Sequence, residues 1–150
     1  MLKLEDVTVR FGGLTALNQI SLEVGQEDIV GLVGPNGAGK TTLFNAISGL
    51  ARLKKGRITF GNADLLKCPL HQRARLGIGR TFQIPQPMHE LTVRENLIVA
   101  QRFGAQEVNP QKIDEILDFA NLTRKATCMA ATDLSLSELK ALEVAKALAT

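Results

Sequence analysis

Residues 34–41 constrain this sequence more strongly than any other part of it. They read Gly-Pro-Asn-Gly-Ala-Gly-Lys-Thr, which satisfies the spacing G-x-x-x-x-G-K-[ST]. Glycines at these positions let a backbone curl around a polyphosphate, so that successive N–H groups point at the phosphate oxygens. The segment therefore predicts a phosphate-binding loop, a structure that stands between a buried strand and the start of a helix.

Each part of this loop has an expected role in binding a nucleoside triphosphate. Lys40 supplies a positive charge for the β- and γ-phosphates, and the Thr41 hydroxyl is a ligand suited to Mg²⁺. A helix that opens at about Lys40 directs its N-terminal dipole at the same anion. The residues expected to contact the nucleotide here are Gly34, Pro35, Asn36, Gly37, Ala38, Gly39, Lys40, Thr41 and Thr42.

The flanking residues provide the setting that such a loop requires. Residues 28–33 are almost all apolar and predict a short buried strand of a parallel sheet, and residues 42–48 predict a helix. Residues 2–10 and 20–24 alternate between apolar and polar side chains, which indicates two strands of a small antiparallel sheet. Residues 57–60 are expected to form a further strand that runs into a turn.

The second half of the sequence has the periodicity of helices. Residues 70–76 predict a short helix, and Pro85 and Pro87 then break regular structure in a loop. Three longer helices have recognisable start signals, which are Thr92 with Glu95, Asn109 before Pro110, and Ser135 with Glu138. The expected fold class is α/β, with a nucleotide-binding core in residues 1–83 and a helical subdomain in residues 84–150.

Composition limits the partners of such a chain. Apolar residues make up 45% and charged residues 22% of the sequence, as in ordinary soluble globular proteins. The net charge is +3, and the densest basic cluster, at residues 52–57, fits a solvated turn better than a surface for nucleic acid. No segment approaches ~20 apolar residues. We therefore expect a cytoplasmic protein that reaches any membrane through a partner.

With its motifs in this order, the sequence resembles the ATP-binding subunit of an ATP-binding cassette (ABC) transporter over its whole length. The resemblance implies ATP and Mg²⁺ as cofactors, with Phe11 stacking on the adenine ring. Gln83 ends the run Arg80-Thr81-Phe82-Gln83 and matches the glutamine that in this family reaches Mg²⁺ and the attacking water. It is the expected catalytic residue and, together with Thr41, an expected Mg²⁺ ligand, because an amide coordinates through oxygen while donating through nitrogen.

The resemblance also implies two kinds of protein partner. In the family, the part that corresponds to loop 84–91 contacts the transmembrane permease subunits, which places the protein at the cytoplasmic face of the cell membrane. Residues 134–138 stand where the family carries Leu-Ser-Gly-Gly-Gln, and Ser135 is the residue expected to bind the γ-phosphate of ATP held by a second subunit. That pair is a homodimer or a heterodimer of nucleotide-binding subunits, and no nucleic acid is involved.

The signature segment departs from the family pattern. Leu136 and Ser137 replace the two glycines, and Glu138 replaces the glutamine. A carboxylate beside a phosphate is unfavourable unless it turns away, for instance to cap its own helix. The alternative interpretation is a well-capped helix without a role in binding.

Three runs narrow the resemblance to importers of branched-chain amino acids, and these are residues 11–14, 77–83 and 91–97. Importers of urea and short-chain amides share the pattern, so the solute stays open. The family's apolar strand ending in Asp-Glu and its switch histidine do not occur in the sequence. We therefore expect an N-terminal fragment, incomplete at the C-terminus, that binds ATP but does not hydrolyse it alone.

Other classes of function remain as alternatives. A regulatory module that only binds ATP is consistent with the same loop. An ABC protein that acts on nucleic acid or the ribosome needs a basic patch and long inserts or a second cassette, neither of which is visible. A P-loop kinase or GTPase leaves the Ser135 region unexplained, and the guanine-reading pattern Asn-Lys-x-Asp is absent.

Overall fold

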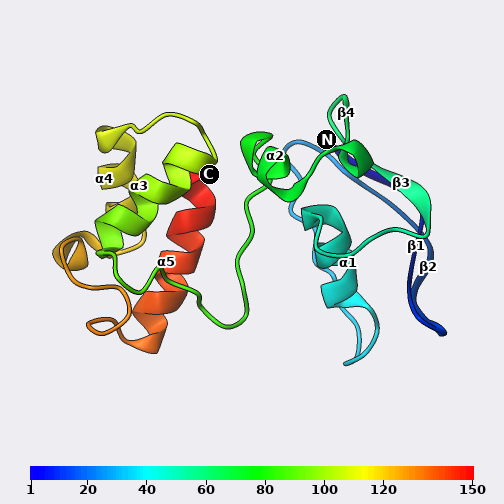
Figure 1. The fold of residues 1–150 in the computed structure, drawn as a ribbon, viewed down its shortest axis with the longest axis horizontal. Helices are drawn as coiled ribbons and strands as arrows, with labels where there is room; N and C mark the ends of the chain where they lie inside the picture. Colours follow the sequence, from blue (N-terminus) through cyan, green and yellow to red (C-terminus); the bar gives the residue numbers. More distant parts are fainter. The chain divides into compact units, whose positions relative to one another are not determined.

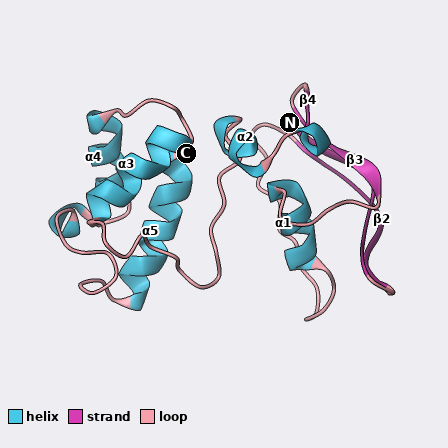
Figure 2. Cartoon of the chain, in the orientation of Figure 1, coloured by secondary structure: helices cyan, strands magenta, loops and turns pink.

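The computed structural model describes all residues from 1 to 150 and divides them into two compact units, Met1–Arg73 and Ala74–Thr150. All strands belong to the first unit, and the second is built from helices and loops (Figure 2). The compact units therefore divide after Arg73, whereas the functional division expected after Gln83 stays a prediction.

The first unit contains a small sheet with an N-terminal hairpin. Its strands are β1 (Leu2–Phe11), β2 (Leu14–Val24), β3 (Lys55–Phe60) and β4 (Ala63–Asp64). They lie in the order β2-β1-β3-β4, and every neighbouring pair is antiparallel. This confirms the N-terminal antiparallel strands that the alternation of side chains predicts. Leu4 and Ile58 fill the core on one face of this sheet.

Helix α1 (Lys40–Ser48) packs against β2 in the same unit. It begins and ends at glycines in the left-handed conformation, Gly39 with φ 88° and Gly49 with φ 89°. Leu43 and Ala46 form its buried face. The predicted helix after the loop is therefore confirmed, and Figure 1 shows it beside the sheet, in cyan.

The predicted strand at residues 28–33 is wrong. This segment contains no regular structure, and the side chains of Ile29 and Val33 are 101% and 95% exposed relative to an extended reference. A strand exists only as part of a ladder of hydrogen bonds. The strands of the sheet pair with one another and leave no partner beside residues 28–33, so apolar composition alone does not make this segment a strand.

A buried arginine joins α1 to the two short helices that follow β4. These are the 3₁₀ helix η1 (Leu65–Lys67) and α2 (Leu70–Arg75). The guanidinium of Arg73 donates to the carbonyls of Ala46 and Ile47 at 2.8 and 2.7 Å, to Cys68 at 2.9 Å and to Leu65 at 2.5 Å. It thereby provides a donor to the Ile47 carbonyl and a second donor to the Ala46 carbonyl, which also accepts from the N–H of Gly49 at 3.3 Å.

The second unit is a helical bundle with one core. Its elements are α3 (Val93–Phe103), α4 (Pro110–Phe119), the 3₁₀ helix η2 (Thr123–Lys125) and α5 (Leu136–Ala149). Helices α3 and α4 both pack on α5. The largest buried side chains of this core are Leu97, Ile113, Leu117, Leu122 and Leu142. All three predicted start signals are confirmed as N-caps of these helices. No helix in the chain combines the length and the apolar content that spanning a bilayer requires.

Candidate functional site

The phosphate loop leads into α1 through glycines that no other residue could replace without strain. Gly37 and Gly39 have φ angles of 82° and 88°, in the left-handed region that side chains disfavour. At Gly39 there is also no space, because a Cβ atom would lie 2.6 Å from the carbonyl oxygen of Ala16. The glycine pattern of the motif is therefore used to bend the loop and to bring it against β2.

The start of α1 presents free N–H donors. Gly39 is the N-cap and has no side chain to accept from them, and the first turn contains no acidic residue. The first intrahelical bond runs from the N–H of Leu43 to the carbonyl of Gly39, at 2.9 Å. The N–H groups of residues 40–42 come before that bond and form the positive end of the helix dipole. These donors fit an anion, and the loop beside them is exposed.

The Lys40 side chain folds back across the loop. Its ammonium donates to the carbonyl oxygens of Gly34 at 2.5 Å and Pro35 at 2.7 Å. The charge therefore lies against the first two residues of the loop. This arrangement concentrates positive potential at one point, as the binding of β- and γ-phosphates requires.

Phe11 lies at the end of the N-terminal hairpin. It is the last residue of β1 and pairs with Leu14 at the start of β2. Its side chain is 52% exposed, so its ring is available to a ligand. Ala16, which meets Gly39, is only two positions further along β2. The hairpin end and the phosphate loop thus belong to one region of the first unit, and stacking of Phe11 on adenine stays a prediction.

The other two predicted site residues belong to the second unit. Gln83 is exposed in an irregular segment, and Ser135 is the N-cap of α5. The structure therefore divides the predicted constellation, with Phe11 and residues 34–42 in one unit and Gln83 and Ser135 in the other. The joint use of Thr41 and Gln83 as Mg²⁺ ligands stays a prediction for the same reason.

The Glu138 carboxylate is turned toward its own helix. It accepts from the backbone N–H and the hydroxyl of Ser135, both at 2.7 Å, in a complete capping box. These bonds, the backbone one first, lower the pKa of Glu138 from its ordinary 4.5. The carboxylate is thereby kept in a fixed position at the helix start, which is the arrangement under which an acidic residue is tolerated there.

The capping box of α5 is expected to open in acid. Because the pKa of Glu138 is lower in the folded than in the unfolded chain, the stabilisation is complete above about 4.5 and is lost as the pH falls through the lower folded value. The Ser135 amide resonance should titrate below pH 4.5 in an NMR experiment, and Glu138→Gln should remove the titration. Glu95, whose pKa is likewise lowered by Thr92, serves as the internal control. A midpoint at or above 4.5 contradicts the assignment.

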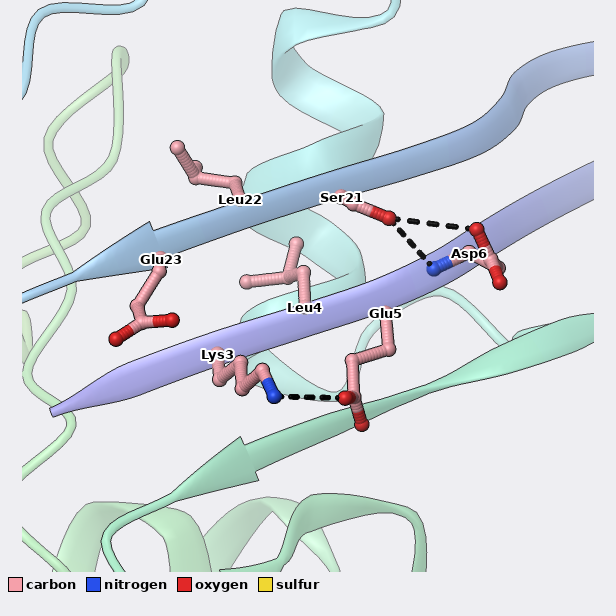
Figure 3. A pocket seen from close by; sticks show the side chains of 7 residues that line it. All are labelled: Lys3, Leu4, Glu5, Asp6, Ser21, Leu22 and Glu23. Carbon is pink, nitrogen blue, oxygen red and sulfur yellow. Dashed lines mark hydrogen bonds and ion pairs between the residues drawn. The ribbon is translucent and has the colours of Figure 1, made fainter.

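A hollow of about 410 Å³ lies on the hairpin but does not suit a nucleotide. Figure 3 shows the carboxylates of Glu5, Asp6 and Glu23 around it, with Lys3 as the ammonium among them. Lys3 is paired with Glu5 at 2.8 Å, which raises the pKa of Lys3 and lowers that of Glu5. The remaining charge is negative and repels phosphate, so the loop is the better site.

Sequence reasoning missed three polar side chains of the second unit, of which Asn96 and Glu143 are buried and Lys146 is partly buried. Asn96 is fully buried and donates to the carbonyl of Thr92 at 2.9 Å, while its amide oxygen accepts from the N–H of Met88 at 2.8 Å. Glu143 and Lys146 bind the backbone of Gln86. The available signal was the position of Glu143, which falls between apolar residues on the packed face of α5.

The chain is similar to known proteins over nearly its whole length. The family model described as ABC transporter matches residues 17–150. A probable branched-chain amino acid transport ATP-binding protein LivG from Archaeoglobus fulgidus is 38% identical over 162 positions, which cover 99% of this chain and 63% of the relative. The ADP conformation of MJ1267, an ATP-binding cassette of an ABC transporter, superposes with a TM-score of 0.82 at 31% identity and covers 99% of this chain and 64% of that one. The dimeric cassette MJ0796 bound to ADP and Pi gives 0.84 at 25% identity, covering 99% and 69%. The chain thus spans less than two thirds of the LivG relative.

Proposed function

The chain belongs to the ABC transporter family, and we propose that it is the ATP-binding, energy-coupling part of an importer for branched-chain amino acids or related small solutes. Its LivG relative is named for transport of those amino acids. The observation that carries the proposal is the loop at residues 34–39, where left-handed glycines, uncapped N–H groups and the Lys40 ammonium converge.

The nucleotide is proposed to bind along the first unit. The N–H groups of residues 40–42 and the Lys40 ammonium hold the β- and γ-phosphates, and Phe11 stacks on the adenine. The chemistry that Mg²⁺ would supply there, when bound, is the withdrawal of charge from the phosphates. The Thr41 hydroxyl and the Gln83 amide oxygen are the hard donors that this ion prefers. Gln83 also orients water through its amide N–H groups.

Two kinds of partner are proposed. Ser135 at the start of α5 contacts the γ-phosphate of ATP held by a second nucleotide-binding subunit. The dimeric form of the related cassette MJ0796 supports the pairing of two such subunits. Residues 84–91 contact the membrane-spanning permease subunits, so that the protein is peripheral at the cytoplasmic face. We propose ATP hydrolysis for the full-length protein. Residues 1–150 supply the phosphate-binding loop and Gln83, and none of their carboxylates is proposed as the base that deprotonates water.

The transport role predicts a loss of uptake. Deleting the gene is expected to abolish energy-dependent uptake of leucine, isoleucine and valine, because the permease then has no coupling subunit. Uptake of labelled leucine by deletion and complemented cells measures this, and complementation with the Lys40→Ala gene is the matched control. Labelled urea and acetamide test the related solutes. Unchanged uptake of leucine, urea and acetamide contradicts the proposed function. Loss of urea or acetamide uptake with leucine uptake unchanged reassigns the solute.

A further inference from the structure

The segment at residues 84–88 has its backbone held by side chains. Pro85 and Pro87 have no backbone N–H. The backbone N–H groups of residues 84–88 are therefore those of Ile84, Gln86 and Met88. The Gln86 N–H donates to Glu143 of α5 at 3.2 Å, and the Met88 N–H donates to Asn96 of α3 at 2.8 Å. The chain is thus tied to two different helices within three residues.

Gln86 is bound from both sides. While its N–H donates to the Glu143 carboxylate, its carbonyl accepts from the Lys146 ammonium at 2.7 Å. Glu143 and Lys146 also form an ion pair with each other, one helical turn apart. Each charged group therefore has one partner on α5 and one on the backbone of Gln86, and the pair closes around that residue.

The location of this ion pair favours a positioning role over a stabilising one. Glu143 is only 3% exposed, and a buried ion pair is often no more stabilising than apolar residues of similar volume. What the pair supplies is a defined geometry, because it fits one N–H and one carbonyl at a single place on the chain. Apolar side chains would hold the segment without selecting that place.

A close backbone contact also holds the chain against α5 before this segment, at Gly79. A Cβ atom at Gly79 would lie 2.6 Å from the carbonyl oxygen of Ala147, so the chain runs directly against α5 there. The side chain of Ile84 points away from these contacts and is 76% exposed, and Phe82, just before the segment, is 40% exposed with the Arg80 guanidinium 5.0 Å from its ring centroid. The backbone is therefore fixed while the Ile84 side chain stays available to a partner.

We infer that Glu143 and Lys146 are positioning residues that lock Gln86 onto α5, so that the segment 84–88 and the Ser135 end of the helix move as one body. Glu143 lies about 12 Å along the helix from Ser135, at ~1.5 Å per residue. The identity of the partner that uses the segment rests on the proposed function. The lock itself depends only on contacts within the second unit.

The test replaces both charges at once. The variant Glu143→Leu/Lys146→Met leaves no unpaired buried charge, so that α5 keeps its packing. Hydrogen exchange of the Gln86 amide, measured by NMR on the full chain, is expected to be at least about tenfold faster than in the wild type, and the amides of Leu142 and Ala145 unchanged. Lys146→Arg retains the donor and should keep exchange slow. Lys140→Met, at an exposed lysine of the same helix, is the matched control.

A second measurement separates positioning from mere packing. The affinity of the protein for its membrane-spanning subunits in detergent is expected to fall at least about tenfold in the double variant and to be retained by Lys146→Arg, with MgATP affinity unchanged in both. Unchanged exchange at Gln86 overturns the lock. Faster exchange with unchanged subunit affinity overturns the positioning role. Failure of the wild type to bind MgATP overturns the proposed function instead, and the exchange measurement still decides the lock.

Discussion

Replacing Lys40 with alanine is expected to weaken ATP binding by roughly 100-fold or more, because charge-assisted hydrogen bonds to two phosphates are lost. The ammonium lies against the loop, bonded to the carbonyls of Gly34 and Pro35. No other cation of the loop or of the first turn of α1 can substitute for it, since the remaining residues there are glycine, proline, alanine, asparagine and threonine. Calorimetric titration of wild type and variant with MgATP measures the loss.

Two controls accompany this substitution. Lys55→Ala removes an exposed lysine of β3 in the same unit and should leave the affinity unchanged. The wild type should bind ATP no more weakly than GTP, because the loop contacts phosphates and the guanine-reading pattern is absent. An unchanged affinity in Lys40→Ala refutes the assignment of the loop, and a strong preference for GTP refutes the choice of nucleotide.

Replacing Arg73 with methionine is expected to lower the free energy of unfolding of the first unit by about 3 kcal/mol, because buried carbonyls lose a charged donor. The guanidinium serves four carbonyls from α1, η1 and the chain before α2. Burial lowers its pKa, yet arginine stays charged at neutral pH. Its charge is thus stabilised by aligned carbonyl dipoles. Urea denaturation, followed by exchange of the α1 amides, measures the effect.

Arg75→Met is the matched control, since Arg75 lies in the same helix and is exposed. It should change the stability by less than about 0.5 kcal/mol, as is usual for surface substitutions. Arg73→Lys should also be destabilising, because one ammonium cannot reach carbonyls on three sides. Equal stability of Arg73→Met and Arg75→Met means that the four carbonyls find other donors.

The sequence predicted those parts of the fold that depend on neighbouring residues. The capping boxes at Thr92 and Ser135 and the glycine bends around α1 need only residues within a few positions, and all are present. The strand predicted at residues 28–33 failed because pairing needs a second strand beside it. Arg73 escaped notice because its acceptors come from several different elements.

The candidate site follows the same division. The geometry of the phosphate loop was predictable, because the motif specifies glycines and a lysine at a fixed spacing. The buried Glu143 was not, because a Glu and a Lys one helical turn apart are ordinary on an exposed face. Only the approach of Gln86, which is distant in the sequence, turns that pair into a lock.

The lock and the N-cap of α5 also impose a constraint on length. Successive residues of a helix are rotated by about 100°. Inserting one residue between Ser135 and Glu143 would therefore turn Glu143 and Lys146 away from Gln86. Only a change in length by whole helical turns would keep Ser135 and Glu143 in the same relative orientation. The irregular stretch between α3 and α4 follows no such helical phase, and its constraint is one of space, since a Cβ atom at Gly104 would lie 2.5 Å from the Thr150 side chain at the C-terminal end of α5.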